Sequence, residues 1–256
     1  MLRSIRRVIL ASMCLAAAMP ELAPVLLAQS GAPPDLSGVW MRNRDSGTFG
    51  KQLPPMRPEA KRVFDANRGG PNPAADEGLD EMDPSIYCLP HGTPRAWTLN
   101  YPFEIVQAPN AVHILYESSL MRRRIFLDGR KMPDNYPTSY MGFSSGRYQD
   151  DALVAETVGL DDSTWIDGRA IPHSTALKVT ERIRRASPST LEIDFTFTDP
   201  NTFTSPWSAK LGFNLQNTEI MEHIGYCEDR FRYNNQNKVF KGTVRWQSPE
   251  QAESPR

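Results

Sequence analysis

The chain has 256 residues, with 29 Lys and Arg against 30 Asp and Glu, which gives a formal net charge of −1. That length suits one domain, and the balanced charge argues against a general nucleic-acid binder, which would carry a basic surplus. The 22 Pro exclude a mostly helical bundle, because proline breaks helices and interior strands. We therefore expect a loop-rich single domain that does not bind nucleic acid.

The N-terminal segment is typical of a secretory signal peptide. Arg3, Arg6 and Arg7 form a positive n-region. Residues 8–19 follow as an apolar stretch. We expect residues 1–28 to be removed, which would place the mature protein in the periplasm or outside the cell. The alternative is a membrane anchor, but the apolar stretch is shorter than the roughly 20 residues that a span requires.

Removal of this segment changes the cysteine count and the charge. Cys14 would be lost, and the mature protein would keep only Cys88 and Cys227. Two cysteines in an exported protein predict a disulfide; the alternative is two separate buried thiols. Three Arg and one Glu would also be lost, which leaves a net charge of −3. After cleavage we expect no stable membrane span.

The first expected strand covers residues 35–41, after a short polar leader. Residues 41–100 then form a loop-rich insertion, in which frequent Pro and Gly leave room for only one short helix. We place that helix at residues 58–65, with Pro58 near its start. Residues 88–95 form a further loop with turn-forming residues.

The remainder of the chain alternates polar and apolar residues with a period of two, which is typical of strands. Turn sequences separate the strands, and Asp128-Gly129 is the clearest hairpin turn among them. We expect residues 247–256 to be disordered. The expected strands cover residues 103–107, 111–117, 122–127, 141–148, 153–158, 175–184, 191–198, 207–215 and 219–226.

These elements predict an all-β fold. Strands without intervening helices disfavour a parallel sheet. A single antiparallel sheet of this length curls and closes, which removes its exposed edges. We therefore expect residues 29–246 to form one antiparallel meander closed as a barrel, with a two-sheet β-sandwich as the alternative. The sequence leaves the oligomeric state open.

The start of the first strand resembles that of lipocalin-like barrels. Gly38-Val39-Trp40 matches their Gly-x-Trp start. In those barrels the Trp closes one end and an Arg from the last strand packs on it. The resemblance therefore implies this position for Trp40, with Arg230 or Arg232 contacting its ring by a cation–π interaction.

The wider chain resembles a group of secreted bacterial β-proteins. The resemblance covers most of the mature chain and implies export and a single domain, but no particular chemistry. The matching segments are residues 34–40, 88–95, 102–107, 124–130, 141–142, 168–174 and 206–207.

The polar loop of residues 159–173 is the leading candidate for catalysis. An aspartate, Asp161 or Asp162, bonded to one ring nitrogen would fix the tautomer of His173 and make it a general base. Trp165 can stack on an aromatic or sugar ring of a ligand. The alternative is that the two aspartates cap a turn and His173 only ties the loop to the barrel rim.

Five further residues complete the candidate site. Tyr140, Tyr148 and Arg95 are candidate acids or oxyanion stabilisers, and Tyr140 is also a candidate ligand contact. His91 and His113 are further ligand-binding candidates. The alternatives are a structural loop around the disulfide for His91 and a hydrogen-bonded core histidine for His113.

The arginine pairs and the histidines do not by themselves identify an anion site or a metal site. Arg122 and Arg124 share one face of a strand and would suit an anion if they adjoined Arg182 and Arg184; a solvated outer face is the alternative. No two of the four His have metal-ligand spacing, and no nucleotide-binding motif is present. We therefore expect no metal and no cofactor, although a composite metal site from distant segments stays open.

Together these features favour an exported β-barrel whose mouth takes a small, partly aromatic or apolar molecule. We expect a cofactor-independent lyase, isomerase or hydrolase that uses His173 as a general base. One alternative is a non-catalytic binding or carrier protein, and another is an envelope interaction protein. An enzyme predicts polar, titratable groups that converge inside the barrel, and a carrier predicts an apolar lumen with at most one polar anchor. An interaction protein predicts a filled barrel together with an exposed apolar patch.

If the two mature cysteines are bridged, the closed loop is worth up to roughly 4–5 kcal/mol in the chain-entropy model. Thiol labelling of the exported chain under denaturing, non-reducing conditions should then detect no free thiol. Labelling after reduction should detect both Cys88 and Cys227. Detection of both thiols without reduction would show that the two cysteines are separate.

Overall fold

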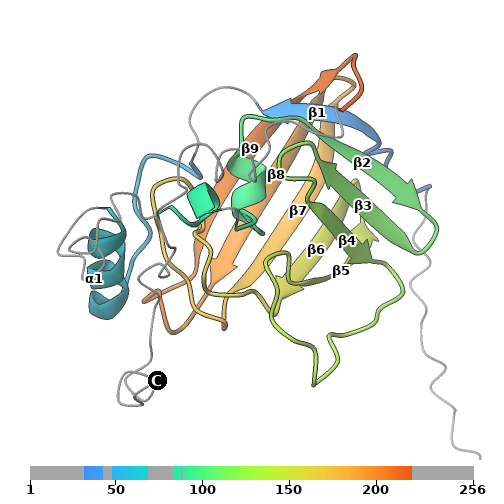
Figure 1. The fold of residues 1–256 in the computed structure, drawn as a ribbon. Coiled ribbons are helices and arrows are strands. Elements are labelled where there is room, and N and C mark those ends of the chain that lie inside the picture. The colour runs from blue at the N-terminus through green and yellow to red at the C-terminus, as the bar shows by residue number, and fades with distance from the viewer. Residues whose placement is uncertain (1–31, 43–47, 69–82, 88, 221–256) are drawn as a thin grey trace, which may run out of the picture. The chain divides into compact units, whose positions relative to one another are not determined.

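The computed structural model describes residues 32–42, 48–68, 83–87 and 89–220 (Figure 1). The expected signal peptide, Cys88, Cys227 and the C-terminal tail lie outside these residues. Most of the strand expected at residues 219–226 also lies outside them. The expectations for these segments stay predictions.

In the described part of the chain, nine strands form a closed barrel in which neighbours in sequence are neighbours in the sheet and β9 pairs with β1. The expected all-β barrel is confirmed, and the sandwich alternative is wrong because the sheet closes on itself. The strands are β1 (Gly38–Arg42), β2 (Phe103–Ala108), β3 (Ala111–Tyr116), β4 (Arg122–Phe126), β5 (Phe143–Gln149), β6 (Ala152–Val158), β7 (Lys178–Ser187), β8 (Thr190–Thr198) and β9 (Trp207–Gln216).

Burial alternates along the long strands, because one face of a barrel wall points inward and the other meets solvent. In β8, Leu191, Ile193, Phe195 and Phe197 are buried, whereas the residues between them are partly or fully exposed. Burial of these apolar side chains is the main force that holds the wall together. The period-two pattern of the sequence therefore identifies the inner face of this strand correctly.

One pairing departs from the expected antiparallel meander: β4 and β5 run parallel. They meet at only two positions, between Ile125 and Phe126 of β4 and the start of β5. A parallel pair requires a longer return of the chain than a hairpin, and residues 127–142 provide it. The turn at Asp128-Gly129 therefore does not close a hairpin. As a consequence, the first part of β4 has no ladder partner on β5.

The insertion contributes one α-helix and two short 3-10 helices in its described part. The helix α1 (Pro58–Asn67) confirms the helix expected at residues 58–65. Pro58 lies in its first turn, where the missing N–H leaves no intrahelical bond unmade. The 3-10 helices are η2 (Pro84–Tyr87) and η3 (Arg95–Thr98). No described helix has the length and apolar character that a membrane crossing requires.

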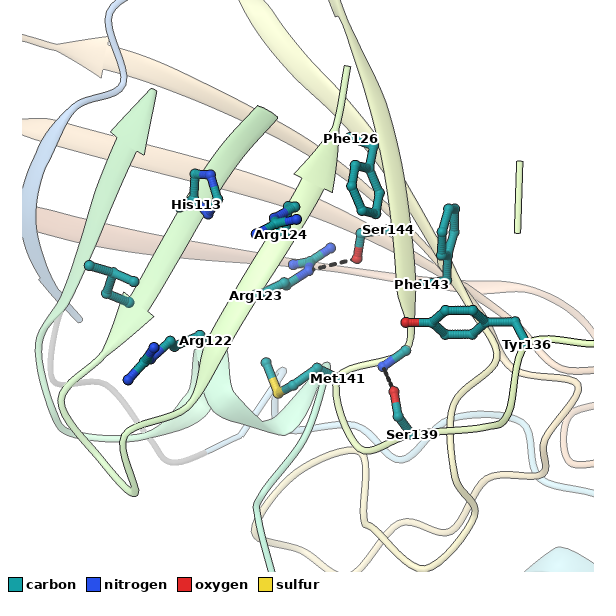
Figure 2. A pocket seen from close by; sticks show the side chains of 12 residues that line it. His113, Arg122, Arg123, Arg124, Phe126, Tyr136, Ser139, Met141, Phe143 and Ser144 are labelled. Atoms are coloured by element: carbon teal, nitrogen blue, oxygen red, sulfur yellow. Dashed lines mark hydrogen bonds between the residues drawn. The ribbon is translucent and has the colours of Figure 1, made fainter. Parts of the chain in front are cut away.

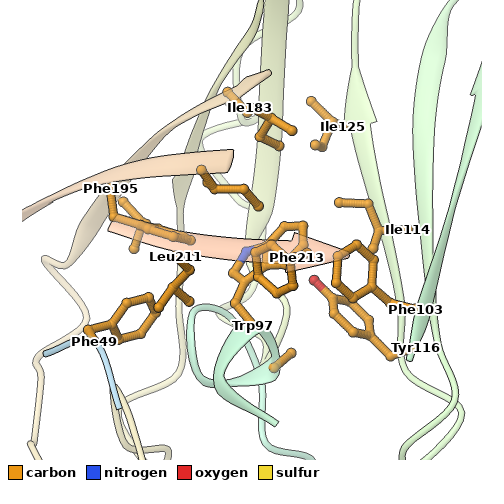
Figure 3. Close-up of a cluster of buried hydrophobic side chains, with 14 of the residues drawn as sticks. Phe49, Trp97, Phe103, Ile114, Tyr116, Ile125, Ile183, Phe195, Leu211 and Phe213 are labelled. Atoms are coloured by element: carbon orange, nitrogen blue, oxygen red, sulfur yellow. The ribbon is translucent and has the colours of Figure 1, made fainter. Parts of the chain in front are cut away.

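The insertion also supplies part of the barrel core, because η3 places Trp97 inside it (Figure 3). The Trp97 ring contacts Phe103, Tyr116 and Phe213, with ring centroids 4.9, 5.7 and 5.9 Å away. Such aromatic pairs each contribute about 0.5–1.5 kcal/mol beyond the burial of area. Side chains of the chain itself therefore fill the interior around Trp97.

A buried ion pair lies beside Trp97. Arg123 of β4 and Glu181 of β7 have side chains that are only 1% and 0% exposed. Both terminal nitrogens of the guanidinium donate to the carboxylate, and Nη1 lies 2.9 Å from Oε1. The indole N–H of Trp97 donates to the same Oε1 over 2.7 Å. The pair therefore links two strands of the wall to the inserted helix.

Two hydroxyl groups complete this network. Arg123 Nε donates to Ser144 Oγ over 3.0 Å, and Nη2 donates to Thr157 Oγ1 over 2.7 Å. Burial alone would lower the pKa of Arg123, but the Glu181 carboxylate raises it above the ordinary value, so the guanidinium stays charged. Burial also raises the pKa of Tyr116 beside the pair and keeps its phenol neutral. The network joins β4, β5, β6 and β7.

Trp40 of β1 contacts an arginine of β7, whereas the lipocalin resemblance implies an arginine of the last strand. Its side chain is buried, and Nε1 donates to the carbonyl of Leu36 over 3.0 Å. The guanidinium of Arg185 in β7 lies 5.1 Å from the centre of the Trp40 ring. Arg230 and Arg232, which the sequence suggested for this contact, lie outside the described residues.

Replacing Arg123 with Met should destabilise the protein strongly, because Glu181 would remain buried without a counter-charge. The free energy of unfolding should fall by about 3–5 kcal/mol, as measured by chemical denaturation. The matched control is Arg184→Met, which breaks a partly exposed ion pair with Glu192 and should cost at most about 1 kcal/mol. Similar losses in both variants would contradict a dominant role for the buried pair.

Candidate functional site

The candidate catalytic loop lies against the barrel and is largely buried. Asp161 accepts a hydrogen bond from the backbone N–H of Ser163 over 2.9 Å and a second from the Ser163 hydroxyl. The hydroxyl of Thr164 lies 3.3 Å from the Asp161 carbonyl oxygen. Asp161 therefore caps a turn of its own loop instead of contacting the ring of His173.

His173 is 0% exposed, and both ring nitrogens are engaged. Nδ1 lies 3.0 Å from the carbonyl oxygen of Ser174, and Nε2 lies 3.0 Å from the hydroxyl of Thr164. Because a carbonyl only accepts, Nδ1 carries the proton and Nε2 accepts from Thr164. Burial lowers the pKa of His173 despite the nearby carboxylates, Asp162 among them, so the ring is neutral. A backbone carbonyl therefore sets its tautomer.

Other candidate residues gather around an ion pair at the same loops. Both terminal nitrogens of Arg95 donate to Asp83, over 2.7 and 2.5 Å. The Arg95 guanidinium also lies 5.2 Å from the centre of the Trp165 ring. Burial and the positive charge of Arg95 lower the pKa of His91 to about 4. Within the described chain, Arg95 Nε and Trp165 Nε1 are buried without a hydrogen-bond partner.

The two tyrosines of the candidate site are separated. The backbone carbonyl of Tyr140 accepts a hydrogen bond from the Thr93 N–H over 2.8 Å, so this residue belongs with the loops. Tyr148 lies toward the other end of β5, where Gln107 Nε2 donates to its hydroxyl over 2.7 Å. Tyr148 lies five residue steps along β5 from Phe143, a distance of about 17 Å. Sequence reasoning thus brought Tyr148 wrongly into one group with the loop residues.

A notch opens in the barrel wall between β4 and β5 (Figure 2). It forms because these strands pair at only two positions. The cavity has a volume of about 540 Å³, which is in the range of small-molecule sites. We call it the β4–β5 notch. Its lining residues are His113, Leu115, Arg122, Arg123, Arg124, Phe126, Tyr136, Ser139, Met141, Gly142, Phe143 and Ser144.

One side of the β4–β5 notch is cationic. Arg122 and Arg124 are exposed on the outer face of β4, while Arg123 between them is buried. His113 of β3 pairs across the ladder with Arg124. Within the described residues, neither exposed arginine lies within ion-pair distance of a carboxylate. His113, predicted as a ligand contact, thus lines a cavity on the outer face and is not a core histidine.

The other side of the notch is aromatic. Phe126 and Phe143 stack with their ring centroids 5.3 Å apart. Tyr136, from the connection between the strands, meets Phe143 edge-on at 5.4 Å. The guanidinium of Arg130, which is paired with Asp128, lies 4.4 Å from the centre of the Phe126 ring. The notch therefore offers aromatic surface next to positive charge.

The anion site suggested for four arginines does not form. Arg182 pairs with Asp151 over 2.6 Å, and Arg184 pairs with Glu192. Both lie on β7, which neighbours β6 and β8 and does not adjoin β4. The arginines of β7 therefore belong to a salt-bridged outer face, whereas those of β4 line a cavity.

Most of the notch could not be found from the sequence. The sequence shows the run of three arginines. It does not show that the first part of β4 lacks a ladder partner on β5, which is what opens a cavity beside these arginines. Tyr136 lay in an expected loop, and no local pattern links it to Phe126 or Phe143. A long connection between two strands is the one sequence feature that hinted at a gap in the ladder.

Comparisons with known proteins assign no family to the chain. Neither the scan against protein-family models nor the search of the curated proteins found a match. In the described residues, no three His, Cys, Asp or Glu side chains come together as a metal site would require. The resemblance to secreted bacterial β-proteins stays a prediction.

The buried histidines predict a pH-dependent stability. Folding lowers the pKa of His173 and takes that of His91 to about 4, from an ordinary value of 6.5. The unfolded chain therefore takes up protons near pH 6.5 that the folded chain does not, and the free energy of unfolding should fall as the pH drops from 7 to 5. Each histidine contributes at most about 1.4 kcal/mol per pH unit.

Denaturation at several pH values checks this expectation. His91→Gln and His173→Gln should each make the pH dependence shallower in that window, whatever they do to stability at pH 7. The control Ile171→Val changes a buried side chain without a titratable group in the same loop as His173, and it should retain the slope of the unmodified protein. An unchanged slope in both buried-site variants would contradict the assignment of neutral buried rings.

Proposed function

We propose that the protein is a non-catalytic binding protein for a small, partly aromatic or apolar molecule, and that the β4–β5 notch holds this molecule. The main support for this proposal is the cavity of about 540 Å³ with an aromatic cluster on one side. Ligand sites of this size use apolar surface for affinity and a few polar groups for orientation. Both kinds of group line the notch.

Tyr136 is the residue that best suits contact with a ligand. Its side chain is 41% exposed although its ring packs on Phe143. Figure 2 shows its hydroxyl directed across the notch toward β4. An aromatic molecule that covers this ring would bury surface that solvent now reaches, and such burial is favourable at about 25 cal/mol per Å².

The contacts of the titratable groups favour binding over catalysis. A cofactor-independent lyase, isomerase or hydrolase requires a base that can accept a proton from its substrate. Both ring nitrogens of His173 are occupied by Ser174 and Thr164. In the interior, Arg123 and Glu181 form hydrogen bonds with each other and with neighbouring side chains, so neither is placed to react with a substrate.

The proposal also includes export. The basic n-region, the apolar stretch of residues 8–19 and the even number of cysteines after residue 28 support a periplasmic or secreted protein. A binding protein in that compartment would capture its ligand outside the cytoplasm.

A neutral aromatic probe tests the proposed site. The fluorescent amine N-phenyl-1-naphthylamine should bind the purified protein, with a rise in its emission. Tyr136→Ala should weaken its binding about two- to tenfold, because one aromatic contact is worth about 0.5–1.5 kcal/mol. Tyr101→Ala is the matched control, since Tyr101 is exposed to a similar extent, 43%, but does not line the notch. Equal affinities in the two variants would overturn the assignment of the site.

A further inference from the structure

We infer that the ligand of the β4–β5 notch is an organic acid whose carboxylate is held by Arg122 and Arg124. The inference rests on the proposed function, which by itself requires only an aromatic or apolar body. It adds the charge of the ligand and names the residues that recognise it.

The first argument is that the two exposed arginines lining the notch have no counter-charge beside them. Arg122 and Arg124 have no carboxylate within ion-pair distance in the part of the chain that the structure describes. Both arginines line the notch, and two positive charges at one cavity without a counter-charge attract an anion to it. Arginines that do pair with a carboxylate are Arg95, Arg123, Arg130, Arg169, Arg182, Arg184 and Arg185.

The strand geometry holds the two guanidinium groups on the same side. Residues two apart on a strand share a face, and their Cα atoms lie about 7 Å apart. Arg123, between Arg122 and Arg124, points into the barrel and is neutralised by Glu181. Glu104 occupies the same row of the ladder as Arg122, but it lies two strands away, at about 10 Å. The charge that faces the notch is therefore positive.

The nature of the neighbouring groups favours a carboxylate on an aromatic or apolar body over a free inorganic anion. The guanidinium of Arg124 lies 5.7 Å from the centre of the Phe126 ring, so the cationic and aromatic sides of the notch adjoin. Arginine presents paired N–H donors that match the two oxygens of a carboxylate. A molecule with a carboxylate close to its ring would contact both sides at once.

A matched pair of probes separates charge from shape. 2-Naphthoate and 2-naphthamide have nearly the same outline, but only the first is an anion. We expect 2-naphthoate to bind at least about tenfold more tightly than the amide, because hydrogen bonds to charged groups are the stronger ones. Its affinity should also fall as salt is raised, because salt screens exposed charges. Isothermal titration calorimetry measures both affinities.

Variants assign the preference to the two arginines. Arg124→Gln and Arg122→Gln should each reduce the affinity for 2-naphthoate about three- to tenfold and leave that for 2-naphthamide unchanged. The control Arg62→Gln removes the same charge from the exposed face of α1, away from β4 (Figure 1), and should change neither affinity. Circular dichroism confirms that each variant is folded; both replaced side chains are exposed on the barrel surface.

The outcomes separate this inference from the proposed function. If both probes bind equally and Tyr136→Ala weakens both, the notch binds aromatic molecules but the inference of an acid is wrong. If the arginine variants bind 2-naphthoate as well as the unmodified protein does, the inference is also wrong. If neither naphthalene probe binds although N-phenyl-1-naphthylamine does, only the inference is wrong; if none of the three binds, the proposed function is wrong as well.

Discussion

Arg123 and Glu181 face each other inside the barrel, and much of the structure depends on that contact. Removing two charges from water costs several kcal/mol per ion, so a buried pair persists only where geometry and further hydrogen bonds offset the cost. Here Ser144, Thr157 and the indole of Trp97 provide those bonds. The pair thereby fixes how β4, β5, β6 and β7 sit around η3. It also explains why a Pro-rich insertion, which has little regular structure of its own, is held inside the fold.

The same contact determines the outer surface of β4. Because Arg123 must point inward to meet Glu181, strand alternation turns Arg122 and Arg124 outward. The parallel pairing with β5 then leaves their flank of the strand open. The inner face of β4 thus belongs to the core and its outer face to the candidate binding surface. A change in the register of this strand would alter both faces at once. A one-residue slip of β4 would turn Arg122 and Arg124 inward and Arg123 outward, and two buried arginines would then face the single carboxylate of Glu181.

The filled interior changes where a ligand is expected. Barrels of this class often hold ligands in their mouths, and the sequence led us to expect a site there. Trp97 occupies that space and packs on Phe103, Tyr116 and Phe213, while the loops with His173 and Arg95 are closed by their own hydrogen bonds. The side wall therefore becomes the place where cationic and aromatic side chains remain open to a small molecule.

Local patterns determined a good deal of this protein. The period-two alternation placed the strands in the described chain, and Pro58 marked the start of α1, but His113, which was expected to point inward, lies on the outer face. The loops that carry His91, Arg95, Tyr140 and Trp165 were also recognised, but only burial showed that these side chains are enclosed. The parallel pairing of β4 and β5 and the inward turn of Arg123 were decided by tertiary structure alone. In a run of three identical arginines no hydrophobic pattern distinguishes the inner face from the outer, so the choice depends on Glu181, which lies far away in the sequence and meets Arg123 only when the barrel closes.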